Sequence, residues 1–325
     1  MSKLLAVHGL EVGYSDSADA STYALKGISF EVASGEILGI LGESGCGKTT
    51  LAKALAGTLP KNTRHAMGHI ELEGISVSPG AHKKQKYDRA SKIVVISQEP
   101  SASLNPVIRI GDQIAEVYRA NNRWDKTRVR EETQALLASL GLPDSDIYNA
   151  YPHQISGGQQ QRVAIAQALA SQPALLIADE PTASLDAETE TGIVKLLKDL
   201  VLARQMALIF ITHNPGILVD FAERTLILYA GRVIEYGSLR DVFATPLHPY
   251  TSALLGCMRD PSNSMNSRNG GRFPTIPGSL PKLEQQHGCN FVSRCPQRLA
   301  VCGEQQPPLI HNASQQSVEC FLYGH

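Results

Sequence analysis

The sequence lacks an excess of charge of either sign, since 30 Lys and Arg residues stand against 31 Asp and Glu residues. Domains that bind nucleic acid usually carry a basic surface, so this balance argues against a nucleic-acid partner. Long apolar runs are also missing, because none reaches the roughly 18 to 20 residues that a membrane-spanning helix needs. The N-terminal stretch turns polar too early for a secretory signal peptide. We therefore expect a soluble, cytoplasmic protein that can dock on a membrane protein.

Cysteine is scarce, and its six residues are unevenly placed. Cys46 stands alone in the first part of the chain, and the other five cysteines follow in the last 69 residues. In a protein of the reducing cytoplasm, a clustered set of cysteines indicates metal binding before it indicates disulfides. The C-terminal part of the chain is therefore a candidate metal site.

Residues 42–49 read GESGCGKT and fit the pattern Gly-x4-Gly-Lys-Ser/Thr. A pattern with so few fixed positions also arises by chance, so the flanking sequence decides its meaning. The apolar run 37–41 before it predicts a buried strand, and the helix-forming residues 50–56 after it predict a helix. A loop between a strand and a helix is the context in which this pattern binds nucleotide phosphates.

The residue types in this loop suit a nucleotide triphosphate. Gly42, Gly45 and Gly47 allow consecutive backbone N–H groups to face an anion, and the helix N-terminus adds its positive dipole end. We expect the Lys48 ammonium to contact the terminal phosphates and the Thr49 hydroxyl to bind Mg²⁺.

A second glycine pair, Gly157 and Gly158, stands at the start of a segment, 160–170, that predicts a helix. Ser156 is well placed as the N-cap of this helix, and the glycines leave backbone N–H groups open to an anion. The chain thus carries a second phosphate-binding device, which one bound nucleotide does not obviously need.

An acidic pair, Asp179 and Glu180, ends the apolar run 174–178, which predicts a buried strand. An Asp in this place can hold Mg²⁺, directly or through water, and the Glu can orient and polarise an attacking water molecule. The alternative is an acidic cap of the next helix, because Pro181 and Thr182 can begin one.

Two more polar side chains, Gln98 and His213, follow the apolar runs 93–96 and 207–211. Open α/β sheets bind their ligands at the carboxyl ends of the strands, so both side chains are candidates for the site. A lone histidine is more often structural, but His213 is positioned to contact a terminal phosphate.

Residues 42–49 are called the phosphate loop below. Segments 4–14 and 28–32 predict an antiparallel pair of strands ahead of this loop. Tyr14 ends the first of these strands and is a candidate to stack on a purine ring. Tyr23 is the alternative, and either residue can equally be an ordinary aromatic of a strand.

Three further segments complete the expected organisation. Residues 107–142 read as helical with two apolar faces, which indicates a helical insertion. Residues 226–229 and 233–236 flank a Gly-containing turn, and we expect this hairpin to close the sheet. Residues 260–288 are rich in Ser, Asn, Gly and Pro and predict a linker.

Over residues 1 to about 250 the chain resembles the ATP-binding subunits of ABC transporters. The matching motifs, in the family's order, are Walker A at 42–49, the Q-loop at Gln98, the signature at 155–159, Walker B ending at Asp179 and Glu180, the D-loop at 184–186 and the H-loop at His213. The resemblance implies an α/β fold of the ABC-type P-loop NTPases, with a RecA-like core sheet, an antiparallel β subdomain and a helical subdomain at about 100–155. It divides the chain into an ATP-binding domain, 1–245, and a small, irregular, Cys-rich C-terminal region, 246–325.

The resemblance also implies that two subunits pack head to tail, with each ATP between the Walker A of one and the signature of the other. Glu180 is then the catalytic base, and Gln98 and His213 sense the terminal phosphate. The other implied ligands of ATP and Mg²⁺ in the same subunit are Tyr14, Gly42, Ser44, Gly45, Gly47, Lys48, Thr49, Thr50, Asp179 and Asp186. Among these, Thr49 and Asp179 bind Mg²⁺ together with Gln98. The residues that complete the partner's site are Ser156, Gly157, Gly158 and Gln159. Ile155 and Asn214 depart from the family's usual Leu and Asp, but neither change removes a catalytic group, so we expect a competent ATPase.

Residues 246–320 resemble the C-terminal region of dipeptide/oligopeptide permease ATPases, in the peptide/nickel branch of importers. This similarity rests on HPYT at 248–251, IPGSLP at 276–281 and GCNFVSRCP at 288–296, and YPHQ at 151–154 agrees with it. It implies a peripheral protein on the cytoplasmic face of the inner membrane, paired with a related ATPase subunit, two transmembrane permease subunits and a solute-binding protein. The implied cargo is a di- or oligopeptide, with nickel, glutathione or a metal chelate as alternatives.

The cysteines of this region are Cys289, Cys295, Cys302 and Cys320, with five, six and seventeen residues between them. Zinc knuckles usually keep two to four residues between paired cysteines, so the spacing weakens a zinc site. Four thiolates also suit one iron–sulfur cluster, and the resemblance implies a [4Fe–4S] cluster with a structural role. Zinc and free thiols remain the alternatives. Cys257 is left over, and we expect it to be buried.

A different class of function is a soluble ABC ATPase of DNA repair or translation, which has no membrane partner. Such proteins commonly carry two ATPase cassettes or a long coiled-coil insertion. This chain has one set of motifs and a short helical insertion, which favours the transporter.

Overall fold

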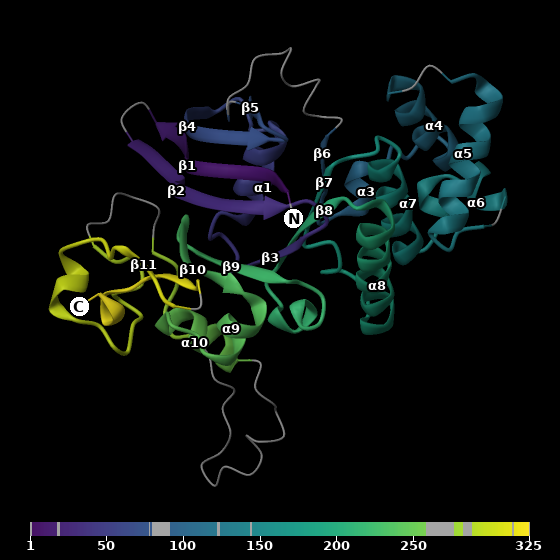
Figure 1. Ribbon diagram of the computed structural model, residues 1–325. Coiled ribbons are helices and arrows are strands. Elements are labelled where there is room, and N and C mark those ends of the chain that lie inside the picture. The colour runs from purple at the N-terminus through teal and green to yellow at the C-terminus, as the bar shows by residue number, and fades with distance from the viewer. Residues whose placement is uncertain are drawn as a thin grey trace, which may run out of the picture.

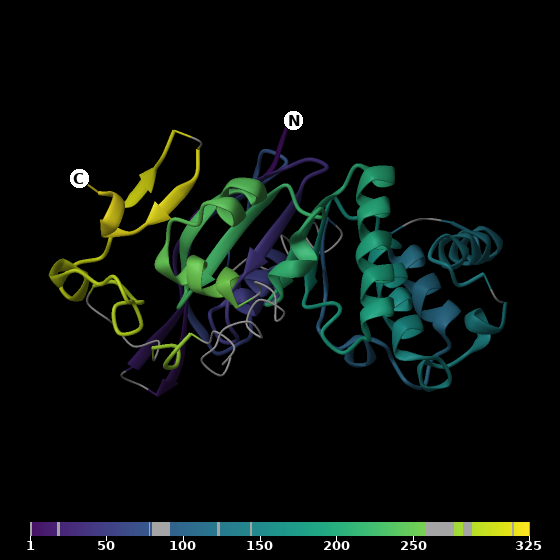
Figure 2. The ribbon, with the colours of Figure 1, turned by 90° about the horizontal axis from the view of Figure 1, so that it is seen from below.

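The computed structural model of the protein describes residues 2–17, 20–77, 79, 92–121, 124–143, 145–257, 276–281, 288–313 and 315–324. Most of the predicted linker at 260–288 lies outside these residues. Two β-sheets occupy the middle of the molecule, a group of helices lies at one end, and the C-terminal region lies at the other (Figures 1 and 2). Among the described residues, none of the helices combines the length and the apolar character needed to span a membrane.

The first sheet is antiparallel and contains β1 (Lys3–Ser17), β2 (Ala20–Ala33), β4 (Thr63–Leu72) and β5 (Ile75–Val77). Its strand order is β2-β1-β4-β5. The predicted antiparallel pair ahead of the phosphate loop is confirmed, with Lys3 opposite Ala33 and Tyr14 opposite Thr22. The two strands are longer than predicted, since β1 continues to Ser17 and β2 begins at Ala20.

The second sheet contains β3 (Ile37–Leu41), β6 (Ile93–Ile96), β7 (Leu175–Asp179), β8 (Ala207–Thr212), β9 (Arg224–Tyr229), β10 (Arg232–Ser238), β11 (Leu309–His311) and β12 (Ser317–Glu319). Its order is β11-β12-β10-β9-β3-β8-β7-β6. The strands β6, β7, β8, β3 and β9 pair in parallel. Every residue of β3, β7 and β8 is buried, as the unbroken apolar runs predicted for strands covered on both faces.

The predicted hairpin of β9 and β10 forms, but the expectation that it closes the sheet is wrong. β10 pairs on its other side with β12, so that Glu235 lies opposite Val318. The Glu235 side chain is fully buried there and accepts hydrogen bonds from the backbone N–H groups of Leu247 and His248 and from Gln316 Nε2, at 2.7, 2.9 and 2.6 Å. The C-terminal region thus extends the second sheet.

The helices are α1 (Lys48–Ala56), α3 (Pro100–Ser103), α4 (Ile110–Asn121), α5 (Lys126–Ser139), α6 (Ser145–Asn149), α7 (Gly157–Leu169), α8 (Ala187–Arg204), α9 (Leu239–Ala244) and α10 (Pro249–Gly256). The segment 107–142 is helical as predicted but divided into α4 and α5. A new helix begins after Asp125, whose carboxylate accepts a hydrogen bond from the backbone N–H of Arg128 at 2.8 Å. An N-cap of this kind marks a helix start inside an otherwise helical pattern.

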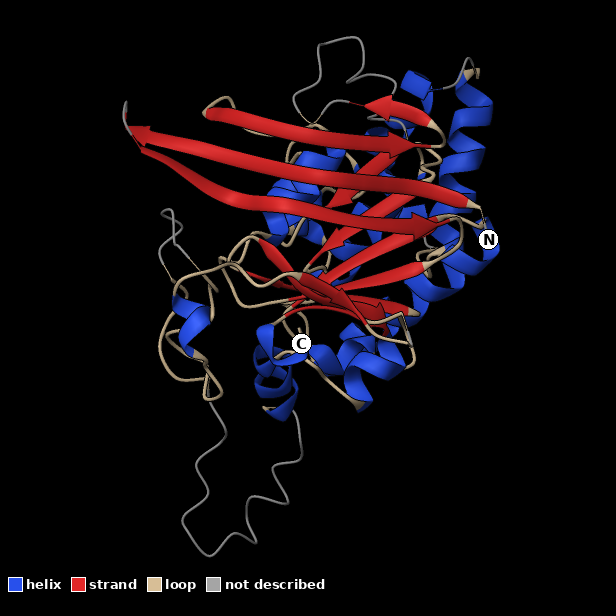
Figure 3. Ribbon diagram, turned by 60° about the vertical axis from the view of Figure 1, so that its left-hand side comes forward, coloured by secondary structure: helices blue, strands red, loops and turns tan. Residues whose placement is uncertain are grey.

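Two hydrophobic cores lie on opposite faces of the second sheet. Successive side chains of a strand point to opposite faces, and in β3 Leu38 and Ile40 enter one core while Ile37 and Leu41 enter the other. The core that contains Leu38 and Ile40 lies between the second sheet on one side and α1 and the antiparallel sheet on the other. The core that contains Ile37 and Leu41 packs against α4 to α10 (Figure 3). The predicted fold class is confirmed, and the phosphate loop begins where β3 leaves these two cores.

Candidate nucleotide-binding site

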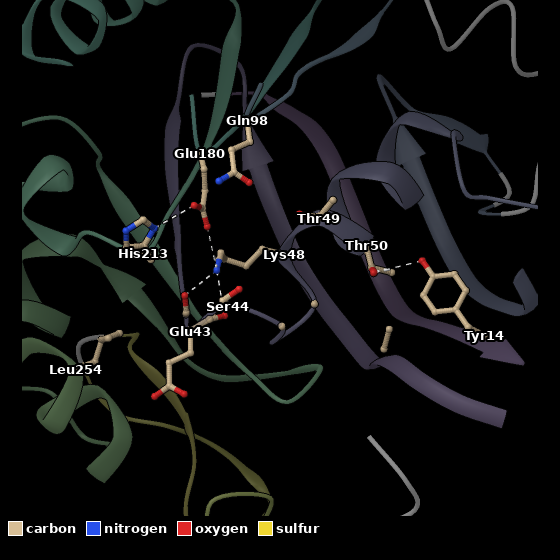
Figure 4. Close-up of a pocket in the computed structure, with 14 residues that line it drawn as sticks. Tyr14, Glu43, Ser44, Lys48, Thr49, Thr50, Gln98, Glu180, His213 and Leu254 are labelled. Atoms are coloured by element: carbon tan, nitrogen blue, oxygen red, sulfur yellow. Dashed lines mark hydrogen bonds and ion pairs between the residues drawn. The ribbon is translucent and has the colours of Figure 1, made fainter. Parts of the chain in front are cut away.

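A pocket of about 710 Å³ opens at the carboxyl ends of β3 and β8, beside the N-terminus of α1 (Figure 4). Most of its lining residues were predicted from the sequence, and Ala24, Glu43 and Leu254 were not. The residues that line it are Tyr14, Ala24, Gly42, Glu43, Ser44, Gly45, Gly47, Lys48, Thr49, Thr50, Gln98, Glu180, His213 and Leu254.

The phosphate loop packs closely against the two strands beside it. A Cβ atom on Gly42 would lie 2.3 Å from the backbone oxygen of Leu228, and one on Gly47 would lie 2.7 Å from that of Ala24. Gly47 also has a φ of 113°, which residues with a side chain rarely adopt. These glycines are therefore required by the contact between the loop and its neighbouring strands, in addition to the exposure of N–H groups that the sequence predicted.

Lys48 is almost fully buried, with 5% of its surface exposed. Its Nζ donates hydrogen bonds to the backbone oxygens of Gly42 and Glu43, at 2.8 and 3.1 Å, and lies 3.4 Å from Oε1 of Glu180. A buried ammonium group needs such partners, because burying an unpaired charge is strongly unfavourable. The ammonium group is thereby held inside the loop at the point where the pocket begins.

Glu180 occupies an uncommon backbone conformation, with a φ of 49°. Left-handed backbone at a non-glycine residue costs roughly 1–3 kcal/mol and persists where the surrounding structure enforces it. Here the backbone N–H of Glu180 donates to the oxygen of Ile211 at 2.9 Å, which ties the turn to β8. The carboxylate then lies between Lys48 and His213, whose Nδ1 is 3.0 Å from Oε2 (Figure 4).

Asp179 and Thr49 form a hydrogen-bonded pair of oxygen groups, of which Thr49 lines the pocket and Asp179 is not among the described lining residues. Burial raises the pKa of the Asp179 carboxyl above its usual range, and a hydrogen bond from the Thr49 side chain acts in the opposite direction. Carboxylate and hydroxyl oxygens are ligands that Mg²⁺ prefers, so this pair fits the predicted metal. Gln98 extends into the pocket near Glu180 and is the third predicted ligand (Figure 4).

Only one of the two candidate aromatics lines the pocket. The hydroxyl of Tyr14 lies 3.3 Å from Oγ1 of Thr50, which follows the phosphate loop on α1. Tyr23 packs instead against His65, with their ring centroids 5.1 Å apart. The geometry therefore favours Tyr14 as the stacking residue.

The second predicted phosphate-binding segment, residues 156–159, forms the N-terminus of α7 but does not line this pocket. Ser156 caps α7 as predicted, since its side chain accepts from the backbone N–H of Gln159 at 3.3 Å while Gln159 Oε1 accepts from the Ser156 N–H at 2.9 Å. Asp186 likewise caps α8 by accepting from the Thr189 N–H at 2.9 Å. Neither Asp186 nor any of residues 156–159 is among the described residues that line the pocket.

The cysteines of the C-terminal region lie near one another without forming a metal site. Burial raises the pKa of the Cys289 thiol to about 11, and the charges of the other three thiols in the ionised state contribute to the increase. The structure describes all four predicted ligands, yet no group of three or more His, Cys, Asp or Glu side chains among the described residues could hold a metal ion. The structure therefore does not support the predicted iron–sulfur or zinc site. The expectation for Cys257 is wrong, since it is exposed at the end of α10.

Two family models match the chain. The model described as "ABC transporter" matches residues 25–183, and the model described as "Oligopeptide/dipeptide transporter, C-terminal region" matches residues 234–302. Two solved structures of this kind are similar to the chain, each with a TM-score of 0.65 and 27% sequence identity. They are the ATP-binding cassette MJ0796 in a dimeric post-hydrolysis state with ADP and Pi, and cbiO1 of Clostridium perfringens, part of the ABC transporter complex cbiONQ; the matches cover 73% and 81% of this chain and 99% and 98% of theirs.

Similar proteins extend over nearly the whole chain. The oligopeptide transport ATP-binding protein OppD of Salmonella typhimurium is 38% identical over 98% of this chain and 93% of its own length. The dipeptide transport ATP-binding protein DppD of Bacillus subtilis is 35% identical, over 99% of this chain and 95% of its own. The site described above and these matches together establish that the chain belongs to the family of dipeptide and oligopeptide transport ATP-binding proteins of ABC transporters, and that it is an ATPase.

Proposed function

We propose that this chain is the ATP-hydrolysing subunit of an importer of dipeptides or oligopeptides, attached peripherally to the cytoplasmic face of the cell membrane. The observation that carries the proposal is the joining of two features in one chain. Lys48, Glu180 and His213 meet in one pocket, and a C-terminal region of the oligopeptide/dipeptide type follows. The relatives named as dipeptide and oligopeptide transport proteins support a peptide cargo over nickel, glutathione or a metal chelate.

In the proposed reaction, water attacks the terminal phosphorus of ATP, the bond from that phosphorus to the bridging oxygen breaks, and ADP leaves with the bridging oxygen while phosphate is released. The Glu180 carboxylate accepts the proton of this water, and its contact with His213 orients it for that role. Lys48 donates to the phosphate oxygens in place of its present backbone partners. Thr49, Asp179 and Gln98 would hold Mg²⁺, which supplies positive charge to the phosphates when it is bound.

The proposed active form is a head-to-tail pair of ATPase subunits beneath two transmembrane permease subunits that receive cargo from a solute-binding protein. The separation of residues 156–159 from the pocket supports the pairing, because the anion-binding N-terminus of α7 does not line the pocket of its own subunit. The dimeric MJ0796 structure, itself a post-hydrolysis state, also supports it.

A mixed dimer of two tagged copies of this chain tests whether the site is shared. With Ser156→Ala in one copy and Glu180→Gln in the other, both lesions fall in the same shared site. The second site stays intact, and we expect about half of the wild-type ATPase rate. With both substitutions in one copy and none in the other, each site carries one lesion, and we expect less than about 10% of that rate. The measurement is the steady-state release of phosphate.

This pair of dimers contains its own control, since both hold the same two substitutions. A site confined to one subunit would give the reverse order of rates and would contradict the shared site. Loss of a helix cap costs about 1 kcal/mol, so Asp125→Ala, which removes the cap of α5, measures that effect alone. Its ATPase rate should stay near the wild-type value.

The transport role is tested by purification from a detergent extract of membranes. We expect the tagged chain to be recovered with two multi-spanning membrane proteins, and its ATPase rate in that complex to rise when a peptide-loaded solute-binding protein is added. If the ATPase rate rises only with a solute-binding protein loaded with nickel or glutathione, that ligand rather than a peptide is the cargo. Recovery as a soluble complex with nucleic acid would contradict the transporter.

We also infer that the C-terminal cysteines hold a cofactor, with a [4Fe–4S] cluster favoured over zinc. The four thiols are not arranged as a metal site in the described residues, but they lie near enough for their charges to interact, and four thiolates are the usual ligands of one iron–sulfur cluster. Protein purified without oxygen should contain equal iron and sulfide and absorb broadly in the visible range. Cys289→Ser should remove most of the iron, whereas Cys257→Ser, outside the set, should not. Colourless protein with stoichiometric zinc would contradict the cluster.

A further inference from the structure

A side chain of the C-terminal region reaches the phosphate loop. Arg294, whose side chain is 4% exposed, donates from Nη1 and Nη2 to the two carboxylate oxygens of Glu43, at 2.9 and 3.0 Å. The two residues are 251 positions apart in the sequence. Glu43 is the second residue of the loop and lines the pocket. A paired contact of this geometry fixes orientation as well as distance.

Arg294 is itself rigidly held. Its Nε donates to the backbone oxygen of Pro277 at 2.8 Å, and its Nη2 lies 3.3 Å from that of Ile276. Nη1 also donates to the hydroxyl of Tyr229 at 3.2 Å, and the guanidinium lies 5.8 Å from the ring centre of Tyr229. The planar fork of an arginine fits such a set of partners, whereas a lysine ammonium does not. Arg294 therefore presents a fixed pair of donors to Glu43.

A second contact fixes the backbone of Glu43. Its N–H donates to the hydroxyl of Tyr250 at 3.0 Å, and Tyr250 is fully buried. The ring of Tyr250 packs against Tyr229 and Phe291, with centroids 4.6 and 5.5 Å apart. Phe291 comes from residues 288–296, which carry Cys289 and Cys295 and form the cysteine-rich loop. The C-terminal region therefore supports Glu43 through this aromatic group as well as through Arg294.

The backbone oxygen of Glu43 completes the connection, because it accepts the hydrogen bond from Lys48 Nζ at 3.1 Å. One residue thus joins the C-terminal region to the ammonium group that faces the phosphates. The charge of Glu43 matters too, since its side chain is 27% exposed at the edge of the pocket. Without Arg294, an unpaired carboxylate would stand beside the negatively charged phosphates.

We propose that Arg294 and Tyr250 clamp Glu43 and so set the affinity of the phosphate loop for ATP, which makes Arg294 a positioning residue of the ATPase. The clamp does two things. It neutralises the Glu43 carboxylate, and it holds the loop in the shape that presents Lys48. The proposal rests on the ATP site proposed above, and it gives the C-terminal region a direct effect on nucleotide binding.

A cycle of three variants tests the clamp by titration with a fluorescent ATP analogue. Arg294→Gln should weaken binding about tenfold, because the Glu43 charge is left unpaired. Glu43→Gln should weaken it less, by about threefold at most, since no charge is left behind. The double variant Arg294→Gln with Glu43→Gln should bind within about threefold of Glu43→Gln alone, which means that removing the carboxylate rescues the loss of the arginine. Arg294→Lys should fall between wild type and Arg294→Gln.

Arg232→Gln is the matched control. Arg232 Nη1 lies 3.7 Å from Glu319 Oε1, an ion pair that also attaches the C-terminal region to the ATPase sheet but does not involve the loop. We expect its ATP affinity to stay within about twofold of wild type. Thermal unfolding of each variant checks folding, and the rescue by Glu43→Gln carries the test should Arg294→Gln alone be unstable.

Several outcomes overturn the clamp. Unchanged affinity of Arg294→Gln does so, as does a double variant whose loss equals the product of the two single losses, or an equal loss in Arg232→Gln. Absence of ATP binding by the wild-type chain would instead reject the proposed ATP site. A chain that shows the rescue but lacks transport partners would retain the clamp and lose only the proposed transport role.

Discussion

Replacing Glu180 with Gln is expected to lower the rate of ATP hydrolysis by at least about 100-fold while ATP still binds. The amide keeps the size of the side chain but cannot accept a proton from water. The position of Glu180 is set by its backbone, which is tied to β8, so the substitution leaves the geometry in place. The phosphate loop also remains, with Lys48 held at the backbone oxygens of Gly42 and Glu43 until ATP binds.

The measurement is single-turnover hydrolysis of ATP together with size-exclusion chromatography. Bound ATP that is not hydrolysed should accumulate as a closed dimer, because in the proposed head-to-tail pair the nucleotide lies between the two subunits. The matched control is Glu188→Gln, which removes an exposed carboxylate from the first turn of α8, outside the pocket. Undiminished hydrolysis by Glu180→Gln would remove this residue from the role of base.

Replacing Lys48 with Ala is expected to weaken ATP binding by about 100-fold, equivalent to about 2.7 kcal/mol. Charge-assisted hydrogen bonds to phosphate are among the stronger interactions of a binding site, and Lys48 lines the pocket from inside the loop. The substitution also removes the ammonium group that lies 3.4 Å from Glu180, whose carboxylate would then oppose the phosphates.

Lys53 offers the control for this prediction, because it lies on the same helix, is exposed and is not among the residues that line the pocket. Lys53→Ala should bind ATP within about twofold of wild type, since exposed charges contribute little. Equilibrium titration with a fluorescent ATP analogue compares the two variants. Equal affinities in both would show that Lys48 does not contact the phosphates.

The sequence was most informative where the physical cause is local. Unbroken apolar runs predict buried parallel strands, and a short pattern of glycines, Lys48 and Thr49 predicts a loop between strand and helix. Polar residues at strand ends, such as Gln98 and His213, reach one pocket because parallel strands end on one edge of the sheet. The cap of α7 at Ser156 follows from the same kind of local rule.

Contacts between distant segments could not be predicted. The strands β11 and β12 have three residues each, too few for a periodic pattern, and they gain their place by pairing, β12 with β10 and β11 with β12. No local signal joins Arg294 to Glu43, because the contact depends on how the C-terminal region folds back over the loop. The arrangement of the cysteines is equally non-local, since seventeen residues separate the last two of the set.

The pairing of β10 with β12 bears on where this protein can be cut. Residue 246 divides the two regions in sequence terms, yet a truncation there would expose the unpaired N–H and C=O groups of β10 along a new sheet edge. It would also leave the buried Glu235 carboxylate without its Gln316 partner and take Phe291 from the aromatic group around Tyr250. A shortened ATPase module for biochemical work should therefore end after β12 rather than at the boundary between the regions, with the cysteine-rich loop retained as part of its core.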